Sequence, residues 1–358
     1  MLKFAIIGAG AGGQSMAAIL TSQGHSAKLY DIDKEKIRLL KERGTIRVSG
    51  VIECEAAPEV ITDSMEEVMT DVDVVMVVST TDAHRSIALA CKPYLKDGQI
   101  FMLNPGHCGG ALEVANILRG EDGCGKDLII AEAGDLMYGC RSYEVGNILH
   151  TGLKVHVPVA TLPASDVGRL LDVLGPIFPC LQPAANVLET GFEGAGAMLH
   201  PIPSLMNVNK MDLGQSYDYY MEGITPHVAD IISACDKERV AVCRALGVDA
   251  LALGDMLVKT YKLEPKETLY DLIQSIDSYR ALRNPTNTRH RFIVEDTMCG
   301  LVPLASVGHA LGIPTPMMDA FVNIASAVCG RNFWEEGRTA EKLGFAGKTL
   351  DEIQAMVR

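Results

Sequence analysis

The N-terminal segment constrains the fold of this chain more strongly than any other part of the sequence. Residues 2–8, LKFAIIG, are typical of a buried parallel strand and run directly into GAGAGG. Gly8, Gly10 and Gly13 match G-x-G-x-x-G ahead of a helical run that ends near Gly24. In this context the glycines permit a tight turn, close approach of the backbone to a pyrophosphate, and close helix–strand packing. The segment therefore predicts a Rossmann-type dinucleotide-binding unit.

A carboxylate follows these glycines at the distance expected for a residue that binds the adenosine ribose. The second strand, SAKLYDID, contains Asp31 near its end. An aspartate at this position accepts hydrogen bonds from the ribose and repels a 2′-phosphate. Ile32 and Asp33, which follow, supply no compensating arginine. We therefore expect NAD rather than NADP as the cofactor.

The alternation of strands and helices continues through the first half of the chain. The segments DVDVVMVVS, GQIFMLNPG and DLIIAEAG are typical of parallel strands, with a helix beginning near Asp82. Ligands of such sheets bind beyond the carboxyl ends of the strands, which points to residues 79–84 and to the loop at residues 103–110. Gly106 in that loop is a candidate for close approach to the nicotinamide, although an ordinary turn explains it equally well. An ordinary helix start explains His84 equally well.

Helical periodicity replaces this pattern after about Pro183. Apolar residues recur at helical spacing in two segments, at Val228, Ile231, Ile232 and Cys235 and at Leu269, Leu272, Ile273 and Ile276. Thr349 and Glu352 have capping-box spacing ahead of a last helix. We expect an α/β protein with an N-terminal Rossmann-type NAD-binding domain at residues 1–185 and an all-helical substrate-binding domain at residues 186–358. The catalytic cleft is expected between the two domains.

Composition excludes several classes of function. The net charge of −13 without long runs of like charge argues against nucleic-acid or anionic-membrane partners. Ten cysteines without a C-x-x-C pair indicate reduced thiols and no metal site. The chain begins with a strand rather than a signal peptide, so we expect a soluble cytoplasmic protein.

Two segments of the second half carry candidate catalytic groups. In EGAGAMLHPIPSLMN, His200 lies in an apolar run, where a histidine is more often a core residue than a catalyst. In TRHRFIVED, charged residues precede an apolar run, and a solvated helix turn with i,i+4 ion pairs is the simpler explanation. Neither segment alone establishes a site.

Several ordered segments resemble the opine dehydrogenases, and most closely the bacterial carboxyethyl-norvaline dehydrogenase type. The resemblance covers nearly the whole chain and rests on IIGAGAGG, AHRSIALACKPYLKDGQIFMLNPGHCGGALE, GAMLHPIPSLMN, YYMEGITP, RFIVEDTMCGLVPLASVGHALGIPTP and EEGRTAEKLG. In that family a histidine of the LHP segment, an arginine, and an aspartate five residues after it form the catalytic group. The resemblance implies that these are His200, Arg291 and Asp296.

The resemblance also implies a reaction. An NADH-dependent enzyme of this family joins an α-keto acid such as pyruvate to the amino group of an L-amino acid, with His200 as general acid and base. Asp296 would fix the histidine tautomer, and Arg291 would hold a substrate carboxylate. The apolar run around His200 favours a hydrophobic amino acid. Two departures, in EAGDLMYGCR and at residues 297–299 where many relatives have a proline, concern substrate identity.

Two alternatives stay open from the sequence. A keto acid or ketone reductase, of the ketopantoate reductase or glycerol-phosphate dehydrogenase type, shares the domain order but relies on a catalytic lysine. Lys210 is the lysine nearest His200 and looks like a helix-surface residue. The other alternative is a non-catalytic NAD-binding sensor. The oligomeric state is also open, with a homodimer among the alternatives.

Overall fold

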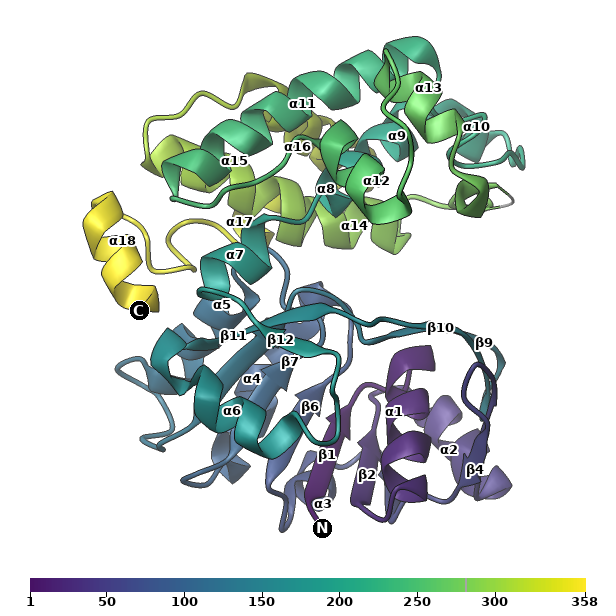
Figure 1. Ribbon diagram of the computed structural model, residues 1–358, viewed down its shortest axis with the longest axis vertical. Coiled ribbons are helices and arrows are strands. Elements are labelled where there is room, and N and C mark those ends of the chain that lie inside the picture. Colours follow the sequence, from purple (N-terminus) through teal and green to yellow (C-terminus); the bar gives the residue numbers. More distant parts are fainter. Residues whose placement is uncertain (281) are drawn as a thin grey trace. The chain divides into compact units, whose positions relative to one another are not determined.

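The chain forms two compact units. The structure is a computed structural model that describes residues 1–280 and 282–358 (Figure 1). One unit comprises Met1–Gly191 with Met356–Arg358, and the other comprises Phe192–Ala355. The division therefore falls a few residues after the expected boundary at residue 185. Contacts explain the difference, because Thr190 and Gly191 hydrogen-bond to Glu132 and Cys108 within the first unit.

The first unit is built on an eight-stranded sheet with the order β12-β11-β8-β7-β6-β1-β2-β5. All neighbouring strands pair in parallel except β8 and β11, which are antiparallel. The four strands predicted from apolar runs and their spacing are confirmed as β1, β6, β7 and β8, and the Asp31 segment as β2. The strands are β1 (Lys3–Ile7), β2 (Ser26–Tyr30), β5 (Val60–Thr62), β6 (Val74–Val77), β7 (Ile100–Leu103), β8 (Ile129–Ala133), β11 (Val157–Leu162) and β12 (Leu181–Pro183).

Helices connect these strands, as a parallel sheet requires. The helix expected near Asp82 begins at His84, after a short 3₁₀ turn at Thr81–Ala83. The helices between and after the strands are α1 (Ala11–Ser22), α2 (Lys34–Arg43), α3 (Met65–Met69), η1 (Thr81–Ala83), α4 (His84–Cys91), η2 (Lys92–Tyr94), α5 (Gly110–Arg119), η3 (Ala164–Asp166), α6 (Val167–Leu174) and α7 (Val187–Phe192).

A second, four-stranded sheet in the first unit was not predicted from the sequence. Its order is β4 (Cys54–Ala56), β3 (Ile46–Gly50), β10 (Asn147–Leu153) and β9 (Tyr138–Glu144). Helix α1 contacts β1 and β2 of the large sheet and β3, β4 and β9 of the small one. The small sheet satisfies two buried polar side chains of α1: Gln14 accepts a hydrogen bond from the Gly146 amide, and Ser15 bonds to His150. The helix is therefore buried on both sides.

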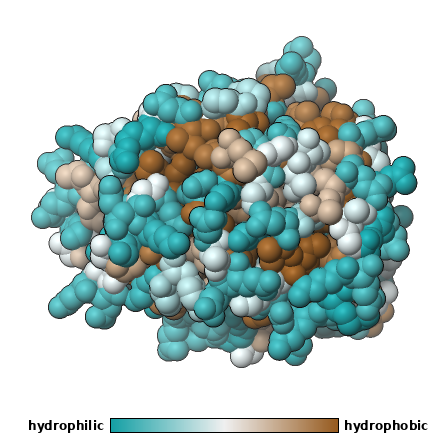
Figure 2. Space-filling view, turned by 90° about the horizontal axis from the view of Figure 1, so that it is seen from below, coloured by the Kyte–Doolittle hydropathy of each residue, from teal (hydrophilic) through white to brown (hydrophobic). Residues whose placement is uncertain are grey.

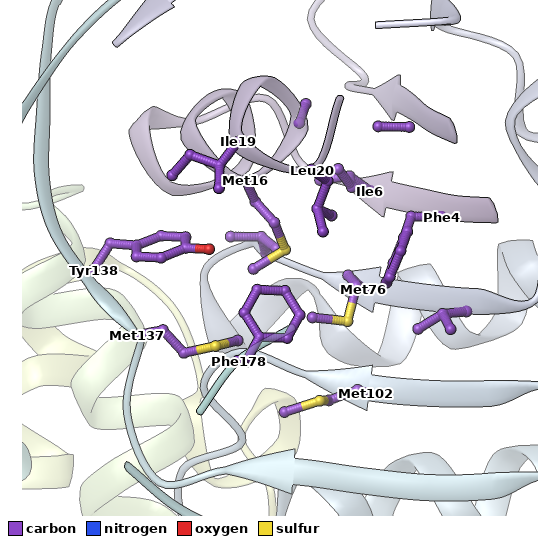
Figure 3. Packing of buried hydrophobic residues seen from close by; sticks show 14 of the residues in the cluster. Phe4, Ile6, Met16, Ile19, Leu20, Met76, Met102, Met137, Tyr138 and Phe178 are labelled. Atoms are coloured by element: carbon purple, nitrogen blue, oxygen red, sulfur yellow. The ribbon is translucent and has the colours of Figure 1, made fainter. Parts of the chain in front are cut away.

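The core of the first unit lies between α1 and the large sheet. Met16 and Leu20 of α1 pack toward Phe4 and Ile6 of β1, as Figure 3 shows, and Ile19 belongs to the same cluster. Methionines of β6 and β7 and an aromatic side chain after α6 extend the same cluster, namely Met76, Met102 and Phe178. This packing fixes the N-terminus of α1 against the end of β1, where the glycine motif lies.

The described part of the second unit is helical, with one isolated β-bridge between Asp218 and Arg283. Its last helix has the predicted capping box, because the Thr349 amide donates to Glu352 and the Glu352 amide donates to Thr349. The elements are α8 (Gly196–Leu199), α9 (Pro201–Met206), α10 (Val208–Asp212), α11 (Pro226–Ala245), α12 (Leu253–Tyr261), α13 (Leu269–Gln274), η4 (Asp277–Tyr279), α14 (Arg291–Asp296), the π-helix η5 (Thr297–Leu301), α15 (Val302–Ala310), α16 (Pro316–Cys329), α17 (Phe333–Glu336) and α18 (Leu350–Val357).

The surface is largely hydrophilic, and the cysteines form no disulfides among the described residues. Hydrophilic residues cover most of the face seen in Figure 2, with smaller apolar areas between them. All ten cysteines are free thiols. No helix among the described residues is both long enough and apolar enough to cross a membrane. In the same part of the chain, no group of three or more His, Cys, Asp or Glu residues is placed to hold a metal ion.

Candidate active site

The glycine motif forms a turn in which two of the three glycines leave no room for a side chain. Gly8 has φ +112°, and a Cβ there would lie 2.3 Å from the Val78 carbonyl oxygen. A Cβ on Gly13 would lie 1.8 Å from the Gly8 carbonyl oxygen. Gly10 caps α1 without a side-chain hydrogen bond, and open space surrounds it. The first turn of α1 therefore presents backbone N–H groups to an anion, which fits the pyrophosphate of a dinucleotide.

Asp31 lies directly after β2, beside this turn. Its Oδ2 accepts hydrogen bonds from the Ala9 amide at 2.7 Å and from Lys36 Nζ at 2.9 Å. Its Oδ1 accepts from the Asp33 amide at 2.9 Å. The carboxylate is thus held at the place where a Rossmann-type fold binds the ribose. Lys36 could not be predicted from the residues next to Asp31, because it lies further along the chain, in α2.

The loop after β7 packs against the buried carboxylate of Glu132, which had no predicted role. Glu132 in β8 is fully buried and accepts hydrogen bonds from the Ala111 amide at 2.8 Å and the Thr190 hydroxyl at 2.7 Å. A Cβ on Gly106 would lie 2.1 Å from Glu132 Oε2. Packing against Glu132 thus explains this glycine, and its approach to the nicotinamide stays a prediction. His84 is fully buried and packs near Gly110, which supports its structural interpretation.

In the second unit, the backbone of His200 is fixed at the junction of α8 and α9. Its amide donates to the Gly196 carbonyl at 3.0 Å. Its carbonyl accepts from the hydroxyls of Ser204 and Tyr219. Burial raises the pKa of Tyr219 well above its ordinary value, so this phenol stays a neutral donor. These hydrogen bonds therefore fix the backbone of His200 in place.

The ring of His200 is fixed by two side chains of α14. Its Nδ1 lies 3.1 Å from Oδ2 of Asp296, and the two side chains are 21% and 18% exposed. The ring of Phe292 stacks on the imidazole at a centroid distance of 4.1 Å and an interplanar angle of 8°. A carboxylate at Nδ1 favours the tautomer that carries its proton there, with Nε2 as the basic nitrogen. His200 is therefore a partly exposed histidine with a carboxylate partner, a geometry that suits a general acid–base group.

Close packing of small residues brings Asp296 to His200. A Cβ on Gly300, in the π-helix after Asp296, would lie 2.8 Å from the Ala197 Cβ in α8. A Cβ on Gly196 would lie 3.4 Å from Asp296 Oδ1. Larger side chains would hold the two segments apart. Residues 297–299 lie in this π-helix, a feature that often marks functional sites.

Arg291 lies at the first position of α14 and faces another way. Its Nε pairs with Glu295 Oε2 at 3.0 Å, and its side chain is 55% exposed. Five helical residues rotate the chain by roughly 140° beyond a full turn, so Arg291 and Asp296 leave the helix on different faces. The i,i+4 ion pair considered for this charge cluster is therefore present. The structure brings His200 and Asp296 together, while Arg291 contacts Glu295.

Two neighbouring side chains complete the description. His290 caps α14 by accepting a hydrogen bond from the Phe292 amide, and burial, followed by the charge of Arg291, lowers the pKa of His290. Lys210 places its ammonium 4.6 Å from the centre of the Tyr217 ring. This cation–π contact gives Lys210 a structural role. Phe292 and Tyr219, which the sequence analysis assigned no role, lie in the segments RFIVED and YYMEGITP that carried the family resemblance.

Two family models match the chain. One, described as the alpha-helical domain of NAD/NADP octopine/nopaline dehydrogenase, matches residues 183–329. The other, described as the NAD binding domain of 6-phosphogluconate dehydrogenase, matches residues 3–105. The first model covers the segment that contains His200 and Asp296, and the second covers the glycine motif and Asp31.

Individual relatives extend this similarity to the full length. An opine dehydrogenase of Arthrobacter sp. (strain 1C) is 35% identical over 99% of this chain and 98% of its own length. A tauropine dehydrogenase of Arabella iricolor is 22% identical over 84% of this chain and 81% of its own.

Solved structures share the fold. Octopine dehydrogenase with NADH and L-arginine matches with a TM-score of 0.81 at 21% identity, over 99% of this chain and 98% of that one. A ketopantoate reductase from Ralstonia eutropha JMP134 matches with a TM-score of 0.62 at 20% identity, over 91% and 98%. At these identities the likeness shows the fold alone.

Proposed function

Because the chain belongs to the opine dehydrogenase family, we propose that His200, Asp296 and Arg291 carry the chemistry of that family in this protein. The enzyme is an NAD-dependent oxidoreductase that acts on CH–NH groups. It joins an α-keto acid to the amino group of an amino acid and also catalyses the reverse oxidation. The contact between His200 and Asp296 is the observation on which the assignment of residues rests.

His200 is the proposed carrier of protons. Addition of an amine to a keto carbon requires loss of a proton from nitrogen, and loss of water from the adduct requires a proton on the leaving oxygen. One imidazole that accepts and returns a proton serves both steps, as a general acid–base group does. Asp296 at Nδ1 directs Nε2 to the substrate and stabilises the imidazolium.

Arg291 is the proposed site for a substrate carboxylate. A guanidinium carries N–H donors on three nitrogens, so the contact of Nε with Glu295 is compatible with a carboxylate on the two terminal nitrogens. A carboxylate held in this way orients the keto carbon. A lysine at this position would supply the charge without the planar, two-point contact.

The proposed cofactor-binding residues are Gly8, Gly10, Gly13 and Asp31, together with Gly106. The glycine turn and the N-terminus of α1 would hold the pyrophosphate, and Asp31 would accept hydrogen bonds from the ribose. Bound NADH supplies the hydride that reduces the imine. Gly106 would border the nicotinamide, with Glu132 keeping its loop in place.

Pyruvate and a hydrophobic L-amino acid are the proposed substrates. Octopine dehydrogenase has been solved with NADH and pyruvate and with NADH and L-arginine, which supports the two substrate classes. The preference for an apolar side chain rests on the surroundings of His200. Leu199, Ile202 and Tyr219 are buried there, and Phe292 covers one face of the ring.

A double-mutant cycle tests the His200–Asp296 unit. We expect His200→Ala to lower kcat about 10²–10⁴-fold, because that is the usual contribution of a positioned acid–base group. Asp296→Asn should lower it less, and the double variant should resemble His200→Ala because the aspartate acts through the histidine. The dissociation constant of NADH should hardly change in any of them.

A matched control is available in the same unit. His227 and Asp230 in α11 also form a contact, at 3.7 Å, but both are exposed. His227→Ala and Asp230→Asn should leave kcat within about a factor of two, since surface substitutions rarely matter. Independent, multiplicative effects of His200→Ala and Asp296→Asn would contradict the proposed pairing.

A further inference from the structure

The groups around Asp31 point to a determinant of cofactor specificity outside the glycine motif. We propose that Lys36 weakens the discrimination of this protein against NADPH, by leaving Asp31 when a ribose binds and staying within reach of a 2′-phosphate. This inference rests on the proposed role of Asp31 as the ribose-binding carboxylate. It concerns a residue of α2 that the sequence analysis assigned no role.

The hydrogen bonds of Asp31 show which partner must leave. Oδ2 accepts from the Ala9 amide and from Lys36 Nζ, and Oδ1 accepts from the Asp33 amide. Each carboxylate oxygen has about two acceptor sites, so Oδ2 is saturated and Oδ1 can accept once more. A ribose offers two hydroxyl donors. Both can bind to Asp31 only if one present donor is displaced.

Lys36 is the donor that can move. The two amide donors belong to the glycine turn and to the residues that lead into α2, so losing them would disturb the backbone. The Lys36 side chain is 27% exposed and ends in a flexible ammonium. Displacing it breaks one ion pair, between a partly exposed ammonium and a largely buried carboxylate.

A second carboxylate keeps the displaced ammonium nearby. Oδ2 of Asp33 lies 4.0 Å from Lys36 Nζ, and the Asp33 side chain is 52% exposed. Asp33 caps α2 through Oδ1, which accepts from the amides of Glu35 and Lys36. Its Oδ2 can therefore take up the lysine without loss of the cap. Lys36 thus moves between Asp31 and Asp33 and stays beside the ribose.

The balance of charge then sets the specificity. Asp31 and Asp33 repel a 2′-phosphate, which favours NADH. Lys36 supplies a cation that can pair with that phosphate, so NADPH is disfavoured less than the two carboxylates alone would require. Removal of the lysine charge should therefore weaken NADPH binding much more than NADH binding.

The test compares dissociation constants rather than turnover. NADH and NADPH are titrated separately into the full-length protein without keto acid or amino acid, with calorimetry as the readout. We expect Lys36→Met to raise the dissociation constant of NADPH about tenfold and that of NADH by less than about threefold, as for a charged hydrogen bond that is partly exposed. Lys36→Arg, which keeps the charge, should retain NADPH binding.

Lys41→Met, at an exposed position in the last turn of α2, is the matched control and should leave both constants unchanged. Thermal unfolding without nucleotide confirms that each variant is folded. An equal loss of NADH and NADPH affinity in Lys36→Met would overturn the inference and reduce Lys36 to a support of Asp31. Unchanged constants for both nucleotides would overturn it as well. Failure of the wild-type protein to bind either nucleotide would instead remove the proposed role of Asp31.

Discussion

At the scale of single residues, the orientation of His200 depends on two side chains of α14, Asp296 and Phe292. The segment around His200 is apolar and does not distinguish a core histidine from a catalyst. The family resemblance pointed to Asp296 as its partner, and the structure places the two side chains 3.1 Å apart across a separation of 96 residues. The stacking of Phe292 could not be predicted, because a ring contact between distant segments leaves no local pattern. For Arg291, the structure contains the i,i+4 ion pair with Glu295 that the charge pattern predicted as the simpler explanation.

Phe292 provides a prediction at this scale. Its ring covers one face of the His200 imidazole and is itself packed by Tyr219 at 5.1 Å and His290 at 4.7 Å. Phe292→Leu removes the flat surface that sets the plane of the imidazole. We expect kcat to fall about tenfold or more, since small errors in the position of a catalytic group are costly.

Phe292→Tyr keeps the stacked ring and should restore most of the activity. The pH dependence of kcat distinguishes positioning from a loss of stability, because a change in the surroundings of His200 should move the profile in Phe292→Leu and not in Phe292→Tyr. Equal kcat values and superimposable profiles for Phe292→Leu and the wild-type protein would show that the stack has no positioning role.

At the scale of secondary structure, local signals were sufficient for the glycine turn and the two strands beside it. An apolar run, three glycines and an aspartate are consecutive in the sequence, and β1, α1 and β2 form as they predict. The small sheet was missed because β10 pairs with β3, about one hundred residues earlier in the chain, and because its short strands contain charged residues. The π-helix η5 was missed for a similar reason, since close packing against α8 lies beyond any local pattern.

Gly300 tests the role of this packing. A methyl group at position 300 would meet the Ala197 side chain at 2.8 Å, so η5 and α8 must separate by several tenths of an ångström. Because Asp296 directly precedes η5, we expect Gly300→Ala to weaken the contact with His200 and lower kcat about tenfold. The affinity for NADH should be retained.

Gly254→Ala in α12 is the matched control, because the nearest atom to a new Cβ there is 4.0 Å away. This change should preserve kcat and should leave the protein slightly more stable, by up to about 1 kcal/mol, as alanine favours helices over glycine. Wild-type kcat in a folded Gly300→Ala variant would argue that the approach of η5 to α8 does not position Asp296.

At the scale of the whole molecule, the two units contain different groups of the proposed site residues. The first contains the glycine turn and Asp31, and the second contains His200, Asp296 and Arg291. The predicted order of a Rossmann-type domain followed by helices is confirmed. The sequence could not predict the buried contact of Thr190 with Glu132, because the two residues are far apart in the chain. This contact holds the residues up to Gly191 in the first unit. Reductases share this architecture, so the fold alone does not distinguish a ketone substrate from an imine.

Identification of the product distinguishes reduction of an imine from reduction of a ketone most directly. The purified protein is incubated with NADH, pyruvate and single L-amino acids from a broad panel that includes apolar side chains and arginine, and the products are identified by mass spectrometry. We predict a secondary amine whose mass equals that of pyruvate plus the amino acid, less one water and plus two hydrogens, with one NADH consumed per product and little formation by His200→Ala. A hydroxy acid formed at the same rate without any amino acid would contradict the account.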